Sequence, residues 1–254
     1  ALRSGSMNFV VIVSPACALF LNFDGTLVDI APEPGAVVVP CGLVPTLDAL
    51  QQYLSGAVAV VSGRPIREID EYLDPLRLPV AGVHGAERRA ADGAVDMLPP
   101  HPLDEVEHAA ALLLEQHPQL LVEHKDRSIA VHYRQAPHLE RVCCQVMQEA
   151  VERSPGLTLL RGKMVVEAKP GGASKGSAIE AFLREGPFLG RTPVFVGDDV
   201  TDEAGFAAVQ RLGGLGVKVG EGPTVAWQRL PNPGALRLEF ENAVAMKVAR
   251  KASA

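Results

Sequence analysis

The chain has 254 residues, of which 47% are hydrophobic and 21% are charged, values typical of a folded globular protein. This length suits one large domain or two smaller ones, with enough apolar side chains for a sizeable core. The net charge of −6 is opposite in sign to the surface of a nucleic-acid-binding protein or a polybasic membrane anchor. The composition therefore excludes wholesale disorder and argues against nucleic acid and membranes as partners.

An apolar run from Phe9 to Phe23 opens the chain and is interrupted by Ser14 and Pro15. The run is too short to cross a bilayer and lacks the flanks of an export signal, so we interpret it as a buried strand. Residues 1–6, ahead of Met7, are expected to be the remnant of an expression tag. The four cysteines have no CxxC spacing, which favours a reducing, cytoplasmic setting.

Short apolar runs alternate with stretches of helical periodicity in the outer parts of the chain. The predicted strands are 18–23, 57–61, 80–83 and 194–196, and the predicted helices are 44–54, 66–73, 174–184 and 201–212. Because the strands are apolar on both faces, helices should cover both sides of the sheet. The alternation predicts an α/β core with a parallel sheet.

The stretch from 100 to 168 has a different pattern, in the order helix, two strands, helix, two strands. The predicted helices are 103–116 and 137–153, and the predicted strands are 120–125, 128–134, 157–160 and 164–168. Pro-rich and Gly-rich segments flank this stretch. We therefore expect an α+β domain at 100–168, inserted into a core made of residues 7–99 and 169–254.

Polar side chains follow the first two predicted strands. Asn22 and Asp24 alternate at the end of the first strand and so point to the same side, at the edge where open α/β sheets bind ligands. An ordinary Asp-Gly turn is the alternative. After the second strand, Ser62 could donate to a phosphate oxygen while Gly63 allows close backbone approach; Ser62 could equally cap a helix.

A cation and a group of carboxylates come later in the chain. Lys175 lies at the start of a predicted helix, whose free N–H groups together with the ammonium suit a phosphate. Asp198 and Asp199 follow the last predicted strand and would repel one another in a dry crevice, so a hard divalent cation, Mg²⁺ by preference, is expected beside them. Asp202 and Glu203 fit better in the first turn of the next helix, and that helix would be capped by Thr201.

These segments end strands or begin helices at one edge of the predicted sheet, in the order Asn22, Ser62, Lys175, Asp198. The combination resembles the haloacid dehalogenase (HAD) superfamily of phosphotransferases. Its motifs are an Asp-x-Asp pair, a Ser or Thr, a Lys, and a pair of acids near a Gly. The resemblance covers nearly the whole chain and implies a HAD-like Rossmannoid core with an inserted α+β cap.

Within that superfamily, the chain resembles the trehalose-6-phosphate phosphatases. The segments that carry the resemblance are 62–64, 84–87, 123–134, 167–176 and 197–203. The resemblance implies a Mg²⁺-dependent phosphoric monoester hydrolase of trehalose biosynthesis, with trehalose 6-phosphate as substrate. We expect a cytoplasmic monomer.

The resemblance also implies roles for individual residues. An Asp at position 22 would be the nucleophile that forms an aspartyl-phosphate, and Asp24 would act as general acid and then as general base. The metal would be held by the side chain at 22, the carbonyl of Asp24 and Asp198, with Asp199 as a ligand or just behind one. The phosphoryl oxygens would be stabilised by Ser62 and Lys175.

The expected substrate-binding residues are Gly63, Arg64, His84, Glu123, Lys125, His132 and Glu167. Charged hydrogen-bonding side chains commonly hold sugar hydroxyls, which favours Glu123, Lys125 and Glu167 for the disaccharide. The alternative is a solvated sheet face on which His132 is satisfied locally.

Residue 22 departs from the family pattern because it is Asn, whose neutral amide cannot act as the carboxylate nucleophile. We expect the chain to bind substrate and scarcely turn it over. One explanation is a replacement made to retain substrate, and another is a natural relative kept for binding; the other intact motifs favour the first. A phosphatase for another sugar phosphate and a sugar-phosphate-binding pseudoenzyme are the alternative functions.

Overall fold

The computed structural model describes residues 13–252, so the predicted tag remnant at 1–6 lies outside the described residues. The larger part of the protein, called the core below, contains an eight-stranded sheet in the order β12-β11-β10-β1-β2-β3-β4-β5. These strands are β1 (Cys17–Leu21), β2 (Val58–Val61), β3 (Val80–Gly82), β4 (Glu87–Arg89), β5 (Val95–Met97), β10 (Thr192–Gly197), β11 (Leu215–Val219) and β12 (Gln228–Leu230). The strands from β12 to β3 are parallel, whereas β4 and β5 are antiparallel.

Helices cover the core sheet, as its apolar central strands require. They are α1 (Leu43–Tyr53), α2 (Ile66–Leu73), α5 (Lys175–Phe182), α6 (Glu203–Arg211) and α7 (Pro233–Ala252). Helix α1 packs against α7, and α5 packs against α6. Phe20 of β1 is fully buried, with its ring centroid 6.0 Å from that of Phe182 and 5.4 Å from that of Phe188.

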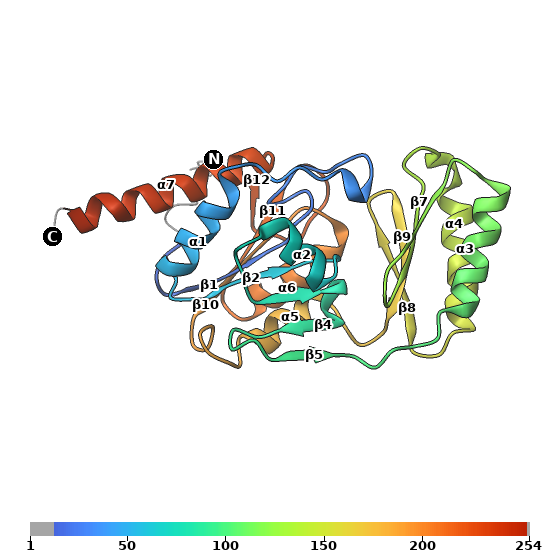
Figure 1. The fold of residues 1–254 in the computed structure, drawn as a ribbon, viewed down its shortest axis with the longest axis horizontal. Helices are drawn as coiled ribbons and strands as arrows, with labels where there is room; N and C mark the ends of the chain where they lie inside the picture. The colour runs from blue at the N-terminus through green and yellow to red at the C-terminus, as the bar shows by residue number, and fades with distance from the viewer. Residues whose placement is uncertain (1–12, 253–254) are drawn as a thin grey trace, which may run out of the picture.

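The smaller part, called the cap below, is built on a separate antiparallel sheet in the order β6-β7-β9-β8. Its strands are β6 (Leu121–His124), β7 (Ile129–His132), β8 (Leu157–Gly162) and β9 (Val165–Pro170). Its helices α3 (Asp104–Gln116) and α4 (Glu140–Glu152) lie on the side of the sheet away from the core (Figure 1). They bury a second hydrophobic cluster that includes Val131 and Met147.

The predicted α/β fold with a mostly parallel sheet is confirmed, and the helices and strands predicted from residue 18 onwards have counterparts with small shifts at their ends. Of the apolar run 9–23, residues 9–12 lie outside the described residues, and the strand covers only Cys17–Leu21. The antiparallel pair β4–β5, the strands β11 and β12, and the helix α7 were not predicted. The structure has two separate sheets and two hydrophobic clusters. The domain boundaries at 100 and 168 stay a prediction. Among the described helices, none combines the length and the apolar character needed to cross a bilayer.

Candidate active site

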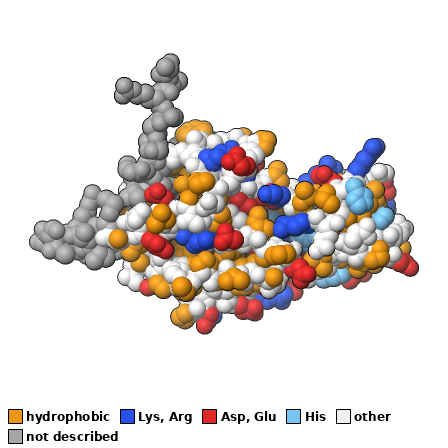
Figure 2. Space-filling model, turned by 90° about the horizontal axis from the view of Figure 1, so that it is seen from above, with side chains coloured by type: hydrophobic (Ala, Val, Ile, Leu, Met, Phe, Trp, Pro, Cys, Tyr) orange, Lys and Arg blue, Asp and Glu red, His pale blue; other side chains and the backbone are white. Residues whose placement is uncertain are grey.

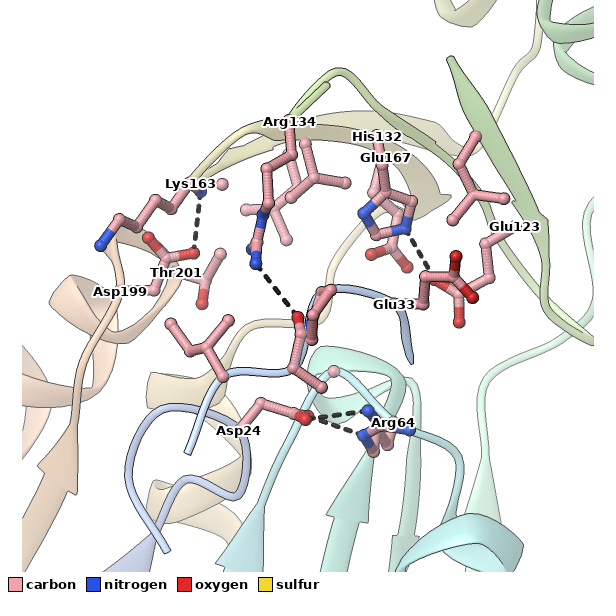
Figure 3. Close-up of a pocket in the computed structure, with 18 of the residues that line it drawn as sticks. Asp24, Glu33, Arg64, Glu123, His132, Arg134, Lys163, Glu167, Asp199 and Thr201 are labelled. Atoms are coloured by element: carbon pink, nitrogen blue, oxygen red, sulfur yellow. Dashed lines mark hydrogen bonds and ion pairs between the residues drawn. The ribbon is translucent and has the colours of Figure 1, made fainter. Parts of the chain in front are cut away.

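A cavity of about 410 Å³ lies between the carboxyl ends of the core strands and the cap sheet (Figure 3). Acidic and basic side chains lie on the surface near the junction of core and cap (Figure 2). The cavity brings together twelve of the sequence-predicted site residues: Asn22, Asp24, Gly63, Arg64, His84, Glu123, Lys125, His132, Glu167, Lys175, Asp198 and Asp199. Ser62 is buried beside it and does not line it.

Asn22 follows β1 directly, and hydrogen bonds hold its buried amide on two sides. Its Nδ2 donates to the backbone oxygen of Asp24 at 2.9 Å and to Asp198 Oδ1 at 2.8 Å. Its Oδ1 accepts from Lys175 Nζ at 3.0 Å. The amide therefore joins three of the predicted motifs at one point.

Asp198 follows β10 and is held from several directions. Thr26 Oγ1 donates to Asp198 Oδ1 at 3.2 Å, and Lys218 Nζ donates to the backbone oxygen of Asp198. Gly25, at a φ of 68°, leaves room for the carboxylate, because a Cβ at this position would lie 2.1 Å from Asp198 Oδ2. The close approach of the first and last motifs therefore requires glycine at position 25.

The residues around Asn22 fit a hard divalent cation such as Mg²⁺. The Asp24 carbonyl and Asp198 Oδ1 are oxygen acceptors, and the electropositive Nδ2 group of Asn22 now contacts both. Burial, together with the charges of Asp202 and Asp199, raises the pKa of Asp198 to about 7. A cation would relieve this excess of negative charge, and Asn22 would then present its amide oxygen in place of its nitrogen.

Asp202 is fully buried within this cluster, in the short 3-10 helix η5 (Val200–Asp202). Its Oδ1 accepts from Lys175 Nζ at 2.6 Å, and its Oδ2 accepts from the backbone N of Asp198 at 2.8 Å and of Asp199 at 3.0 Å. Asp202 and Glu203 do lie where the next helix begins, as predicted, but the carboxylate of Asp202 turns inward to pair with Lys175, a contact that was not predicted.

The carboxylate of Asp199 has other partners than that of Asp198. Its Oδ1 accepts from the backbone N of Val200 at 2.7 Å, which caps η5, and its Oδ2 accepts from the backbone N of Lys163 in the cap at 3.1 Å. The predicted cap at Thr201 is wrong, since Asp199 supplies it. Across residues 13–252, no three His, Cys, Asp or Glu side chains are grouped as a metal site.

Asp24 makes a bidentate ion pair with Arg64. Arg64 Nε lies 2.7 Å from Asp24 Oδ2, and Arg64 Nη2 lies 2.8 Å from Asp24 Oδ1. Glu68 at 3.0 Å and the ring of Tyr72, 5.1 Å from the guanidinium, hold Arg64 from the other side. Although burial opposes it, these neighbours raise the pKa of Arg64 above its ordinary value. Arg64 therefore holds the side chain of Asp24 in this structure.

The loop after β2 is shaped by His84 as well as by its own residues. Ser62 Oγ accepts from the backbone N of Arg64 at 3.1 Å, so it supports a turn and does not cap α2. A Cβ at Gly63 would lie 2.7 Å from the ring of His84, which occupies the space that a side chain at 63 would need. His84 and Val83 both have left-handed φ values, 55° and 47°. For the β-branched Val83 this conformation is strained.

Glu167 of β9 is the buried centre of the cap's polar cluster. Its Oε1 accepts from Ser128 Oγ at 2.6 Å, and its Oε2 lies 3.0 Å from Lys125 Nζ and 3.3 Å from His84 Nε2. Burial alone would raise the pKa of Glu167, but the Lys125 ammonium and the bonds from His84 and Ser128 hold it well below its usual range. Glu167 is therefore an ionised acceptor between core and cap.

A second carboxylate extends this cluster along the cap sheet. Glu123 Oε2 lies 2.9 Å from His132 Nε2 and 3.9 Å from Lys125 Nζ. Burial would raise the pKa of Glu123, but the hydrogen bond with His132 and the charge of Lys125 lower it. Glu123, Lys125 and His132 thus face the cavity from the cap sheet, and Glu123 is the local hydrogen-bond partner of His132 (Figure 3).

Some residues around the cavity were not expected from the sequence. Beside Asp202, they include Glu33, Arg134 and Lys163, and Arg134 Nη1 donates to the backbone oxygen of Ala31 in the core at 3.1 Å. Arg134 lies at the end of the segment 123–134 that carries the family resemblance, but nothing in the sequence pairs it with the loop after Asp24.

The fold is that of the HAD-like hydrolases. A solved haloacid dehalogenase-like hydrolase from B. subtilis superposes with a TM-score of 0.63 at 14% identity, and the match covers 88% of this chain and 99% of that one. The C-terminal domain of the C. albicans trehalose-6-phosphate phosphatase superposes with a TM-score of 0.84 at 18% identity, covering 96% of this chain and 98% of that one. At these identities, the likeness concerns the fold.

The family follows from the sequence comparisons. The family model for trehalose-phosphatase matches residues 20–230. The chain is 46% identical over 220 residues to the trehalose-6-phosphate phosphatase of Escherichia coli strain K12, covering 86% of this chain and 83% of the relative. The chain therefore belongs to the trehalose-phosphatase family, a family of phosphoric monoester hydrolases.

Proposed function

We propose that the cavity is the active site of a Mg²⁺-dependent trehalose-6-phosphate phosphatase whose nucleophile position is occupied by Asn22. The observation that carries the proposal is the convergence of Asn22, Lys175 and Asp198 within direct hydrogen-bond reach, below a cluster of charged cap residues. Family membership supports the choice of substrate class.

Phosphoryl transfer would proceed at the point where Asn22 now lies. With an Asp at 22, a carboxylate oxygen would attack phosphorus, the P–O bond to the sugar would break, and an aspartyl-phosphate would remain. Lys175, which donates to the side chain at 22, is placed to stabilise the phosphoryl oxygens. Asp24 would give a proton to the leaving sugar oxygen and later take one from the attacking water.

The Asp24 side chain has to be released from Arg64 for this role, because both of its oxygens now accept from the guanidinium. Arg64 lines the same cavity and can turn its donors to an incoming phosphate, for which a guanidinium is well suited. Substrate entry would thus free Asp24 and engage Arg64.

Mg²⁺ would be held by the amide oxygen of Asn22, the backbone oxygen of Asp24 and the carboxylate of Asp198. It supplies positive charge that offsets the charge of the phosphate and of the reacting carboxylate. Asn22 retains one oxygen for this purpose, so metal and substrate binding should survive the change from Asp to Asn. Turnover should be lost, because the amide of Asn22 cannot act as the nucleophile.

The sugar would be recognised by Glu123, Lys125 and Glu167. All three face the cavity from the cap and already form a network of charge-assisted hydrogen bonds, whose spare donors and acceptors suit hydroxyl groups. A phosphatase for another sugar phosphate would use the same core residues, so these cap residues carry the choice of trehalose 6-phosphate.

The test is Asn22→Asp, which should raise phosphate release from trehalose 6-phosphate by several orders of magnitude, since loss of a nucleophile costs about 10⁴ to 10⁶ in rate. Calorimetry should show that the Asn22 chain binds the same compound in the presence of Mg²⁺. If Asn22→Asp bound trehalose 6-phosphate and stayed inert, the phosphatase proposal would fail and a sugar-phosphate-binding protein would replace it.

A further inference from the structure

The carboxylate of Asp199 connects the core to the cap. It follows β10 in the core, and its Oδ2 accepts from the backbone N of Lys163 at 3.1 Å, in the turn that joins β8 to β9 (Figure 3). The other oxygen accepts from the backbone N of Val200 at 2.7 Å. Both carboxylate oxygens are thus engaged by backbone N–H groups, one on each side of the junction.

The turn approaches the core closely because residue 162 is glycine. A Cβ at Gly162 would lie 3.0 Å from Asp199 Oδ2 and 3.8 Å from the Thr201 methyl carbon. It would also lie 2.8 Å from Cγ1 of Val165, the residue paired with Gly162 across the turn, so the turn itself would have to shift as well. A methyl group at 162 would therefore displace the Asp199 carboxylate by a few tenths of an ångström.

Asp199 is held rigidly relative to Asp198. Asp202 Oδ2 accepts from the backbone N of both residues, at 2.8 Å for Asp198 and 3.0 Å for Asp199. The turn at Lys163 leads directly into β9, which carries Glu167. The contact at Asp199 therefore fixes the strand of Glu167 relative to the loop of Asp198.

We propose that Asp199 is a positioning residue that latches the β8–β9 turn of the cap to the Asp198 loop, and that it is not a metal ligand. The latch fixes the distance between Glu167 in the cap and the Asp198 loop in the core. Its consequence for substrate affinity rests on the phosphatase function proposed above, whereas the latch itself follows from contacts within this chain.

Amide hydrogen exchange at Lys163 tests the latch without any substrate. In the Asn22 chain, the Lys163 amide should exchange slowly, and Asp199→Ala should speed its exchange by about fivefold or more, the equivalent of one lost hydrogen bond. Saturating Mg²⁺ should leave the amide protected in the unaltered chain. Rapid exchange on addition of Mg²⁺ alone would overturn the proposal, because the carboxylate would then have moved to the metal.

Gly162→Ala tests the latch from the cap side and leaves every proposed metal ligand in place. Calorimetry with Mg²⁺ alone should give the same affinity for this variant as for the unaltered chain. Gly35→Ala is the matched control, because a Cβ at Gly35 would meet nothing within 4 Å. It should leave both Lys163 exchange and Mg²⁺ affinity unaltered.

Substrate affinity supplies the functional readout. Gly162→Ala and Asp199→Ala should each weaken binding of trehalose 6-phosphate by about fivefold or more, and the double variant should be no weaker than Asp199→Ala alone. For Gly162→Ala, inorganic phosphate should bind with unchanged affinity. Additive losses, or complete loss of Mg²⁺ binding in Asp199→Ala, would overturn the latch. If the unaltered chain failed to bind trehalose 6-phosphate at all, the proposed function would fail and the exchange result would still decide on the latch.

Discussion

Asp202 and Lys175 form a fully buried ion pair, with the ammonium nitrogen 2.6 Å from the carboxylate. The same carboxylate also accepts from the backbone of Asp198 and Asp199. Asp202→Asn should lower the free energy of unfolding by about 3–5 kcal/mol, because it removes the carboxylate that pairs directly with the buried Lys175 ammonium. Urea denaturation followed by circular dichroism measures this loss.

Lys175→Met is the control for the ion pair. In the double variant, Asp202→Asn with Lys175→Met, the loss should be smaller than the sum of the single losses, because no buried charge is left unpaired. Strictly additive losses would mean that Asp202 acts through the backbone of the Asp198 loop and not through Lys175.

The cap carboxylates and Lys125 should act on the sugar and not on the phosphoryl group. In a chain that carries Asn22→Asp, Glu123→Ala, Lys125→Ala or Glu167→Ala should reduce kcat/KM for trehalose 6-phosphate far more than for a small aryl phosphate. The aryl compound lacks the hydroxyl groups that these side chains would bind. Equal losses on both substrates would place the residues in the core chemistry or in folding.

Glu149→Ala is the matched control for these variants. Glu149 is an exposed carboxylate on α4, on the opposite side of the cap sheet from the cavity. Its removal should leave both rates unchanged.

At the scale of elements, the N-terminus of helix α2 is capped by a carboxylate from strand β4. Pro65 at its N-cap position offers no side-chain hydrogen bond, and Glu87 of β4 accepts from the backbone N of Ile66 at 2.5 Å. Helix α2 carries Glu68 and Tyr72, which hold Arg64. A carboxylate from β4, which lies between β3 and β5 in the sheet, thus supports the helix that holds Arg64 in place.

Glu87→Ala should therefore destabilise the protein by about 1–2 kcal/mol, the usual cost of a lost helix cap. It should also speed amide exchange at Ile66, which reports the cap directly. Glu71→Ala, an exposed position on the same helix, is the control and should change neither quantity. Unchanged exchange at Ile66 in Glu87→Ala would show that water replaces the carboxylate as the cap.

The sequence predicts the central strands well because they are apolar on both faces and end in polar motifs. It fails at β11 because Gly216 and Lys218 interrupt the apolar pattern, although Lys218 is buried and donates to the backbone of Asp198. The short pair β4–β5 carries mostly charged residues and forms only against the existing edge at β3. Strand β11 and the pair β4–β5 both depend on tertiary contacts, which cannot be predicted from a local sequence pattern.

The residues of the candidate site also fall into two groups, those that can be predicted from a local pattern and those that depend on a distant partner. Residues at strand ends, such as Asn22 and Asp198, can be found from the alternation of side chains along a strand. Asp202 cannot, because its partner Lys175 is 27 residues away on another helix. The ion pair between Asp24 and Arg64, 40 residues apart, likewise requires knowledge of which strands are neighbours.

At the scale of the whole molecule, His84 of the core and Glu167 of the cap meet in a buried place where ionisation depends on folding. Burial is the main cause that lowers the pKa of His84 from 6.5, and the nearby ammonium groups of Lys175 and Lys125 act in the same direction, against the charge of Glu167. The folded protein therefore keeps His84 neutral, whereas the unfolded chain protonates it near pH 6.5.

This difference predicts how stability depends on pH. As pH falls below 6.5, the unfolded chain binds a proton at His84 that the folded protein does not bind, so the contribution of His84 to the free energy of unfolding should fall, by at most about 1.4 kcal/mol per pH unit. Below pH 4.5 the lowered pKa of Glu167 adds a second loss, since its ionised form is favoured by folding. Asp198 acts with the opposite sign, because its pKa is raised to about 7 in the folded protein, which binds a proton there as the pH falls while the unfolded chain does not until near pH 3.8. The contribution of His84 is therefore measured as a difference between two chains.

His84→Asn should remove the contribution of His84 and leave those of Asp198 and Glu167, so its free energy of unfolding should rise relative to that of the unaltered chain as the pH falls from 6.5 to 5. Urea denaturation at several pH values between 4 and 8 would give the slope for both chains, and His108→Asn, at an exposed position on α3, is the control that should keep the original slope. A slope between pH 6.5 and 5 that is the same in His84→Asn as in the unaltered chain would show that His84 takes up its proton in the folded protein as readily as in the unfolded chain. The ring would then be exposed to water in solution, through an opening of the junction between core and cap that this structure holds closed at Glu167.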